Sequence, residues 1–185
     1  GTKRRKVDHG VLRNRTKTTM ESDLTKNIEK YKGDFTKITY RSSWELKCFN
    51  WCDQNSAVKY WSSEEVVIPY LYAVDKKYHR YFMDLKITWK DGSVDLIEIK
   101  PDKETRPPDY PGKKTKRYIN ESLSYIKNEN KWEAARVYAK DRNWGFQIWT
   151  ENTLIKMGIM PKPIKRLKAL KPLKPFKAKK KTTKK

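Results

Sequence analysis

The sequence of this 185-residue chain predicts one mixed α/β domain between two basic tails. Three observations lead to this prediction. Short segments of alternating apolar residues, typical of strands, flank a tight turn at Asp91-Gly92. Helical patterns lie before and after this hairpin, and a last strand is predicted over residues 146–149. A strand, a helix and a further strand in this order are typical of a right-handed parallel crossover, so the sheet should be mixed and flanked by helices.

Most of the positive charge lies outside the predicted domain. The chain has a formal net charge of +22, of which residues 161–185 carry twelve Lys or Arg and no acid, and residues 1–33 carry a net +6, leaving +4 for residues 34–160. We therefore expect a basic N-terminal arm over 1–33, a domain over 34–160 and a Lys/Pro-rich tail over 161–185, with the tails disordered or extended. Such tails favour a polyanionic partner, nucleic acid first, although they can also serve solubility alone.

The few cysteines and histidines argue against a disulfide framework or a zinc site. The two cysteines, Cys48 and Cys52, share one face of a predicted helix, which is typical of small buried residues. The only histidines are His9 and His79, too few for a Cys/His metal set. No apolar run is long enough for a membrane span or a signal peptide, so we expect no membrane partner. We also expect no small-molecule cofactor.

The first elements of the domain are a helix and a short strand. Ser42 or Ser43 can cap a helix that runs to about Asn55. Its apolar face is formed by Trp44, Cys48, Phe49, Trp51 and Cys52. The apolar run 66–70 then predicts a strand, and Pro69 within it indicates a sheet edge or a strand end.

A hairpin follows, with one strand expected over Tyr81–Trp89 and the other over Val94–Lys100. Side chains alternate between the faces of a strand, so Glu98 and Lys100 point the same way. Asp84, in the first strand, lies beside them only if the register of the hairpin allows it.

The length of the hairpin loop decides whether the two acids meet. A two-residue loop would pair Asp84 with Ile99 and place Glu98 on the opposite face. A three-residue loop over Lys90–Gly92 pairs Asp84 with Glu98, and Gly92 can adopt the left-handed conformation that this loop type requires. We therefore predict the three-residue loop.

The remaining part of the domain alternates helices with one strand. We expect a loop over 101–115 and a helix from about Lys116 to Lys127. Asn130 caps a second predicted helix, and Glu133 completes its capping box. Gly145 then leads into a strand over Phe146–Trp149, and a short helix over Glu151–Met157 ends at Gly158. Trp132, Ala135 and Ala139 give the second helix its apolar stripe.

Two carboxylates and an ammonium group on one face are the minimum needed to hold a divalent metal and activate water for phosphodiester hydrolysis. In a basic chain, this combination makes a metal-dependent nuclease the first hypothesis. The plain alternative is a salt-bridged strand face that contributes little to stability.

A set of segments in order along the chain adds to this hypothesis. They are Tyr40-Arg41-Ser42-Ser43-Trp44-Glu45, Trp51-Cys52-Asp53, Trp61-Ser62-Ser63-Glu64-Glu65, Ile68-Pro69-Tyr70, Arg80-Tyr81-Phe82-Met83-Asp84 and Glu98-Ile99-Lys100-Pro101. Over residues 31–155 the chain resembles the PD-(D/E)xK nuclease superfamily, with its restriction-endonuclease-like fold. Within it, the chain is most similar to the head completion nucleases of T4-like tailed phages and, more distantly, to the TnsA transposon-end endonucleases. Met83 stands where the motif name has proline.

The resemblance implies a role for each motif residue. Asp84 would be the motif aspartate, Glu98-Ile99-Lys100 the tripeptide and Glu45 the helical glutamate. Mg²⁺, with Mn²⁺ as an alternative, would be held by Asp84, Glu98, Glu45 and the carbonyl of Ile99. Lys100 would orient or deprotonate the attacking water, or stabilise negative charge on the phosphate.

The resemblance also implies a Mg²⁺-dependent DNA endonuclease that acts in phage head completion. Its partners would be double-stranded DNA and portal, neck or capsid proteins, in the virion and the host cytoplasm. Candidates for phosphate contacts are Arg80, Lys86, Lys113, Lys114, Lys116 and Arg117. Two alternatives stay open: a neck or adaptor protein that only binds DNA or portal through a nuclease-like fold, and a transposon or repair endonuclease that needs a partner to choose its sites.

Overall fold

The computed structural model describes residues 27–163, so most of the predicted N-terminal arm and nearly all of the predicted tail lie outside the described residues. The helices are α2 (Ser43–Gln54), α3 (Lys116–Lys140) and α4 (Glu151–Lys156); the strands are β1 (Val58–Ser62), β2 (Val67–Tyr72), β3 (Lys77–Phe82), β4 (Leu85–Trp89), β5 (Val94–Ile99) and β6 (Gly145–Trp149). Short 3₁₀ turns occur at Ile28–Lys30, Phe35–Lys37 and Asp102–Glu104.

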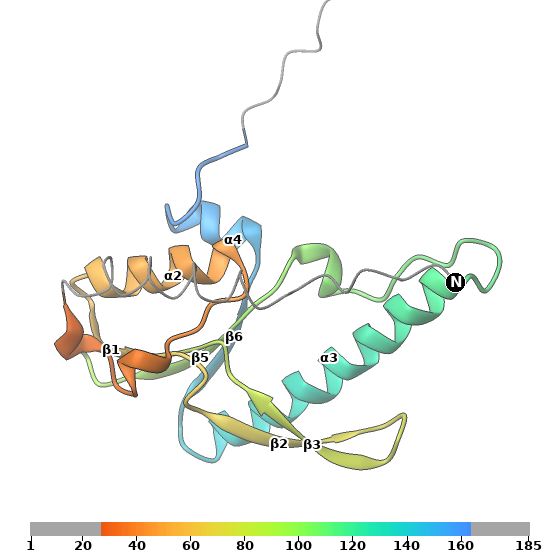
Figure 1. Cartoon of the computed structure of the whole chain (residues 1–185), viewed down its shortest axis with the longest axis horizontal. Coiled ribbons are helices and arrows are strands. Elements are labelled where there is room, and N and C mark those ends of the chain that lie inside the picture. The colour runs from red at the N-terminus through yellow and green to blue at the C-terminus, as the bar shows by residue number, and fades with distance from the viewer. Residues whose placement is uncertain (1–26, 164–185) are drawn as a thin grey trace, which may run out of the picture.

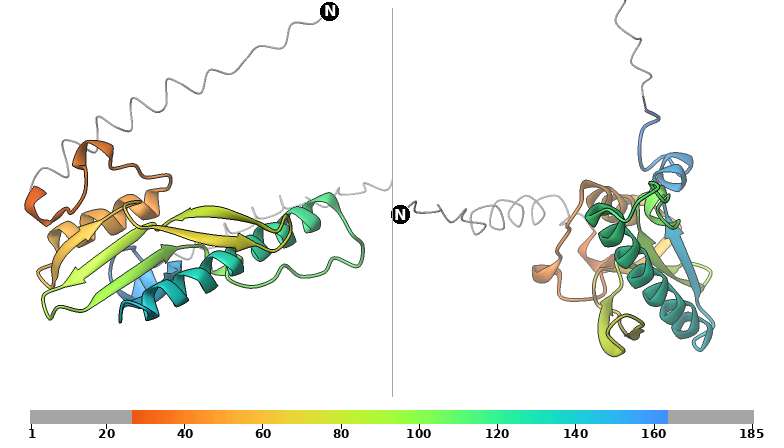
Figure 2. Two further views of the ribbon diagram at one scale, coloured as in Figure 1. Left: turned by 90° about the horizontal axis from the view of Figure 1, so that it is seen from below. Right: turned by 90° about the vertical axis from the view of Figure 1, so that its right-hand side faces the viewer.

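These elements form three layers. The central sheet has the strand order β1-β4-β5-β6, with β5 and β6 parallel and the other pairs antiparallel. Helices α2 and α4 cover one face of this sheet, and α3 with the separate β2-β3 hairpin covers the other (Figure 1, Figure 2). The predicted α/β fold, with a mixed sheet flanked by helices and a parallel crossover through a helix, is confirmed and is consistent with a restriction-endonuclease-like core.

The three-residue loop of the β4-β5 hairpin is also confirmed. The N–H of Trp89 donates to the carbonyl of Ser93 at 2.9 Å, which leaves Lys90–Gly92 as the loop. Gly92 has a φ of 89°, a conformation that glycine adopts without the steric cost of a Cβ. Continued past Leu85 and Ile97, this register places Asp84 opposite Glu98.

The prediction of one strand over Tyr81–Trp89 is wrong, because the chain breaks between β3 and β4 at Met83 and Asp84. Met83 still bonds to the β2 side, where its N–H donates to the carbonyl of Val66 at 2.9 Å. Leu85 already pairs with β5 in the other sheet. The buried side chains before the break, Tyr81 and Met83, pack on the α3 side. The buried side chains after it, Leu85 and Ile87, pack on the α2 side of the central sheet.

The prediction of two helices over residues 116–140 is wrong as well, because α3 is continuous. Asn130 does not cap a helix, since its side chain accepts a hydrogen bond from the N–H of Ala73 at 2.9 Å and ties α3 to the β2-β3 turn. Trp132, Ala135 and Ala139 are buried as predicted. Their packing against the sheet outweighs the weak helix propensity of the asparagines.

In the described part of the chain, no helix combines the length and apolarity that a bilayer crossing requires.

Strand β1 is a further element that the sequence does not predict. A bulge between Val58 and Tyr60 interrupts its alternation, which hides the period of two. Its Trp61 is 2% exposed and packs edge-on against Tyr31, with ring centroids 4.8 Å apart. The N–H of Lys32 also donates to the carbonyl of Trp61 at 2.8 Å. The described end of the expected arm, residues 27–33, therefore packs against the domain.

Candidate active site

Asp84 lies at the break between β3 and β4, where the chain passes from the hairpin into the central sheet. Its Oδ2 accepts a hydrogen bond from the N–H of Ile99 at 2.8 Å. Burial raises the pKa of Asp84 well above its usual range, and the negative charge of Glu98 raises it further, although the bond from Ile99 opposes the shift. The fold therefore holds two carboxylates where at least one of them resists ionisation.

Glu98 is buried on β5, with only 2% of its surface exposed. The hydroxyl of Tyr81 donates to its Oε2 at 2.5 Å, and the Nζ of Lys100 lies 3.1 Å from its Oε1. Burial opposes the charge on Lys100, but the charges of Glu98 and Asp84 outweigh it and raise the pKa of this ammonium. Lys100 is thus held as a cation beside Glu98 and within electrostatic reach of Asp84, the two carboxylates that the sequence predicts as metal ligands.

Glu45 lies at the start of α2, where its carboxylate makes local hydrogen bonds. Its carboxylate accepts hydrogen bonds from the Ser42 hydroxyl at 2.9 Å and the Arg41 N–H at 2.6 Å, while its own N–H donates to the Ser42 side chain that caps the helix. Its charge contributes to the raised pKa of Asp84, so the two groups are within electrostatic reach. Within residues 27–163, however, no three His, Cys, Asp or Glu side chains gather as a metal site. The structure brings Asp84, Glu98 and Lys100 together and leaves Glu45 beside them.

The donors that are present fit a hard divalent cation. Carboxylate oxygens are its preferred ligands, and a cation between Asp84 and Glu98 would relieve the repulsion that raises the pKa of Asp84. In a strand, the N–H and C=O of a residue point to the same side, so the carbonyl of Ile99 lies on the side of Asp84. This is the geometry that the predicted backbone ligand needs.

Two residues of this site were missed by sequence analysis. Tyr81 fixes the orientation of Glu98 through its hydroxyl. Lys131, half-buried on α3, has its Nζ 5.1 Å from the centre of the Tyr81 ring. Burial lowers the pKa of Lys131, while the charges of Glu98 and Asp84 act in the opposite direction. No local pattern could have found Lys131, because it reaches the site only through the packing of α3 on the sheet.

Comparison with known proteins identifies the family. The family model described as "TnsA-like endonuclease N terminal" matches residues 55–151, more than half of the chain. The chain belongs to the TnsA-like endonuclease family. It is also 45% identical over 139 residues to a head completion nuclease from Enterobacteria phage T4, an alignment that covers 73% of this chain and 93% of the relative. No solved structure matches the chain. Both relatives that the sequence resemblance names are therefore confirmed.

The six candidates for phosphate contacts are dispersed over several elements. Lys86 on β4 places its Nζ 4.2 Å from the centre of the Trp144 ring, and burial lowers its pKa. Arg80 stacks over Phe82 on β3. The other four lie in the loop before α3 and its first turn, all exposed; they are Lys113, Lys114, Lys116 and Arg117. The structure assigns no phosphate to any of them, so their role stays a prediction.

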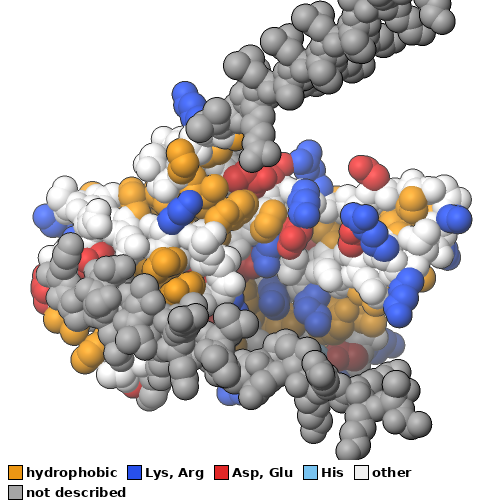
Figure 3. Space-filling view, turned by 45° about the horizontal axis from the view of Figure 1, so that its top comes forward, with side chains coloured by type: hydrophobic (Ala, Val, Ile, Leu, Met, Phe, Trp, Pro, Cys, Tyr) orange, Lys and Arg blue, Asp and Glu red, His pale blue; other side chains and the backbone are white. Residues whose placement is uncertain are grey.

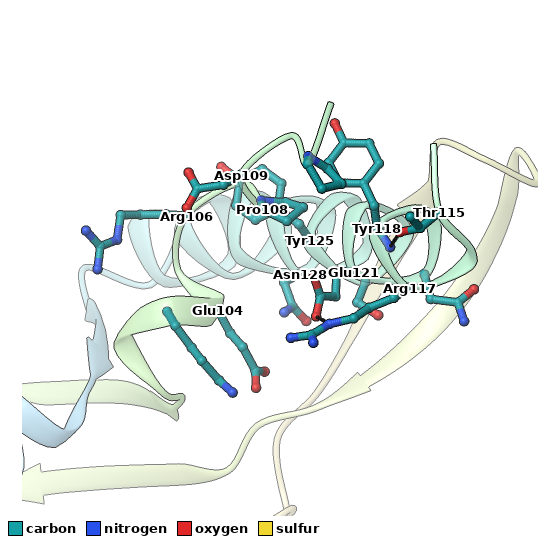
Figure 4. Close-up of a pocket in the computed structure, with 14 residues that line it drawn as sticks. Glu104, Arg106, Pro108, Asp109, Thr115, Arg117, Tyr118, Glu121, Tyr125 and Asn128 are labelled. Atoms are coloured by element: carbon teal, nitrogen blue, oxygen red, sulfur yellow. Dashed lines mark hydrogen bonds and ion pairs between the residues drawn. The ribbon is translucent and has the colours of Figure 1, made fainter. Parts of the chain in front are cut away.

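A cavity of about 670 Å³ lies between the loop after β5 and the first half of α3 (Figure 4). It does not contain the carboxylates. One of its walls is Glu104, whose charge contributes to the raised pKa of Lys100. The cavity therefore adjoins the candidate active site. On the right of the space-filling view, where α3 and this loop lie, basic and acidic side chains are interspersed (Figure 3).

Proposed function

We propose that this chain is a Mg²⁺-dependent DNA nuclease of the PD-(D/E)xK type. The observation that carries the proposal is the arrangement of Asp84, Glu98 and Lys100 at one end of the β4-β5 hairpin in a member of an endonuclease family. Carboxylate oxygens that can hold a divalent cation, with an ammonium group beside them, are what metal-assisted hydrolysis of a phosphodiester requires.

Each residue has a task that its position supports. Asp84 and Glu98 would hold the metal, and Tyr81 keeps Glu98 oriented by its hydrogen bond. When bound, Mg²⁺ supplies a polarised phosphate and a bound water of lowered pKa. Lys100 would donate hydrogen bonds to this water or to the phosphate, because its ammonium lies beside Glu98.

Lys131 would contact the phosphate from the opposite side. It belongs to α3 and Lys100 follows β5, so the two ammonium groups approach the carboxylates from different elements. A phosphate held between them would meet one of these cations on each side, next to the metal. We extend the proposal to this residue as a phosphate-binding side chain.

The relative named a head completion nuclease supports a finer proposal about the biological role. We propose that the chain acts on packaged DNA during phage head completion, in the virion and the host cytoplasm. Portal, neck or capsid proteins would be its protein partners, and the basic segments of the chain would provide attraction for DNA.

The decisive experiment measures cleavage of supercoiled and linear duplex DNA in Mg²⁺ and DNA binding in Ca²⁺. Asp84→Asn and Lys100→Met should lose cleavage by more than about a thousandfold while they retain binding. Glu133→Gln and Lys140→Met, which change exposed residues of α3, serve as matched controls and should cut normally. Binding without cleavage by the unmodified chain would sink the proposal and favour an adaptor.

The head completion role needs a separate test. A T4 strain that lacks its own head completion nuclease can be grown in cells that express this chain or its Asp84→Asn variant. Infectious particles with the unmodified chain alone would support the role. Equal rescue by the variant would show that hydrolysis is not what head completion needs from this protein.

A further inference from the structure

The cavity beside the active site has the size of a ligand site and no assigned role. Its volume of about 670 Å³ falls within the range of about 300–1,000 Å³ that small-ligand sites occupy. One wall is the loop over residues 103–111, and the other is the first half of α3, as the close-up shows (Figure 4).

The charges of the cavity do not favour a free phosphate. Three cations line it, but so do three acids: Lys103, Arg106 and Arg117 against Glu104, Asp109 and Glu121. Arg117 is already paired with Glu121 at 2.8 Å, and Arg106 is paired with Asp102. A polyanion would gain little net attraction here.

The uncharged groups of the cavity instead suit a planar heterocycle. Tyr118 and Tyr125 present aromatic rings one behind the other along α3, and Figure 4 shows both at the wall of the hollow. Asn120 and Asn128 add amides that can donate and accept hydrogen bonds. Aromatic rings beside amide groups are the means by which proteins bind unpaired nucleobases.

The cavity is continuous with the candidate active site along two elements. On the loop side, Lys103 and Glu104 line the cavity and follow Lys100 by only three and four residues along the chain. On the helix side, Asn128 lines the cavity, and Lys131 lies three residues further along α3, within electrostatic reach of Glu98. One helical turn spans about 5.4 Å, so Asn128 at the cavity and Lys131 at the candidate site lie within about one turn of each other on α3.

We propose that this cavity binds unpaired bases of the DNA strand being cut, so that the preferred substrate carries a single-stranded segment next to the scissile phosphate. The proposal rests on the nuclease function proposed above. Paired bases are stacked inside a duplex and cannot enter such a hollow, whereas the bases of an overhang or a flap are free to do so. Blunt duplex DNA would therefore use the active site without filling the cavity.

The kinetic test compares a blunt duplex with the same duplex carrying an overhang or a flap. Stacking of a base on an aromatic side chain contributes about 1–3 kcal/mol, which corresponds to about a 5- to 150-fold preference for the extended substrates. The double variant Tyr118→Ala/Tyr125→Ala should lose this preference and keep the rate on blunt duplex. Tyr125→Phe, which retains the ring, should keep it.

The control variant is Tyr78→Ala, since Tyr78 is 76% exposed on the β2-β3 hairpin and does not line this cavity. It should behave as the unmodified chain does. Equal rates on blunt and extended DNA, or an equal loss on both substrates in the double variant, would overturn the proposal.

A second measurement decides the question even if the chain cuts nothing. An overhang that contains 5-iododeoxyuridine is irradiated with the chain in Ca²⁺, and the cross-linked residues are located by mass spectrometry. Cross-links at Tyr118 or Tyr125 would support the cavity as a base site, whereas cross-links confined to other residues would exclude it. Failure of cleavage on every substrate would refute the nuclease proposal alone.

Discussion

The two faces of the central sheet differ in what they bury. On the α2 side, large apolar side chains such as Phe49, Trp61 and Leu154 are almost fully buried in one cluster. On the α3 side, a smaller apolar cluster adjoins Glu98, and two hollows of about 670 and 430 Å³ border α3. Strand β5 serves both faces, because Ile97 packs on the α2 side and Glu98 points to the α3 side. Because side chains alternate along β5, adjacent residues contribute to the apolar core on one face and to the candidate active site on the other.

The largest effect on stability is expected on the α2 side. Phe49 is 1% exposed and packs against Trp61 with ring centroids 5.3 Å apart. Phe49→Ala removes this packing and leaves a cavity, so the free energy of unfolding should fall by about 3–5 kcal/mol in urea denaturation. DNA binding per folded molecule should not change. A loss of binding beyond the unfolded fraction would show that the two faces are not independent.

On the α3 side, Lys131→Met should cost activity rather than stability. Hydrogen bonds to charged groups contribute about 1.5–3 kcal/mol, so cleavage and DNA affinity should fall by about 10- to 100-fold. The burial that lowers the pKa of Lys131 makes an apolar replacement tolerable for the fold. Lys140→Met is the matched control on the same helix. If Lys131→Met unfolds the protein but leaves the activity of its folded fraction intact, the side chain is structural.

Asp84 should show the opposite pattern, because in the metal-free protein it opposes folding. An unfolded chain titrates Asp near a pKa of about 3.9, whereas burial and the charge of Glu98 raise the pKa of Asp84 in the fold. The folded state therefore binds this proton more tightly, and its stability falls as the pH rises from the unfolded pKa through the folded one. Above that window, the cost of ionised Asp84 stays constant.

Asp84→Asn removes this cost and retains an acceptor for the N–H of Ile99. In EDTA at neutral pH, its Tm should exceed that of the unmodified chain, by about 2–4 °C for each kcal/mol gained. Below about pH 4 the two proteins should melt together. Added Mg²⁺ should stabilise the unmodified chain alone, because only that chain has both ligands. A lower Tm of the variant at neutral pH would contradict the strained carboxylate.

The sequence predicts the site better than it predicts the elements around it. Asp84 and Glu98 could be paired from local rules, because the length of the loop and the glycine at position 92 determine the register of a hairpin. The break at Met83 could not be predicted, since the apolar alternation of Tyr81–Trp89 continues through it. The alternation predicts which residues are buried, but it does not predict that residues before and after the break pack against different layers.

Long-range packing accounts for the other differences. Asn130 has the sequence context of a helix cap, but its partner, the N–H of Ala73, lies 57 residues away in the chain. Lys131 carries no local signal at all, because its neighbours in the site come from other elements.

The smallest effects on stability are expected at the helix caps. One cap belongs to α2 and the other to α3, so they again compare the two faces of the sheet. The side chain of Ser42 caps α2 by accepting from the N–H of Glu45, and Ser42→Ala should cost about 1 kcal/mol of global stability. Thr115 caps α3 in the same way, accepting from the N–H of Tyr118 at 3.1 Å. The buried residues of α3 all lie at Trp132 and beyond, so its first turns can fray without unfolding the domain.

Thr115→Ala should therefore leave the global free energy within about 0.5 kcal/mol of the unmodified chain, while amide exchange over residues 116–120 accelerates about fivefold. Ser42→Ala should instead accelerate amide exchange across the α2 side, because it lowers the global stability. A global cost of Thr115→Ala equal to that of Ser42→Ala would show that the first half of α3 is fixed to the domain. The wall of the cavity would then be rigid before DNA binds, and the base site would be preformed instead of ordered by its substrate.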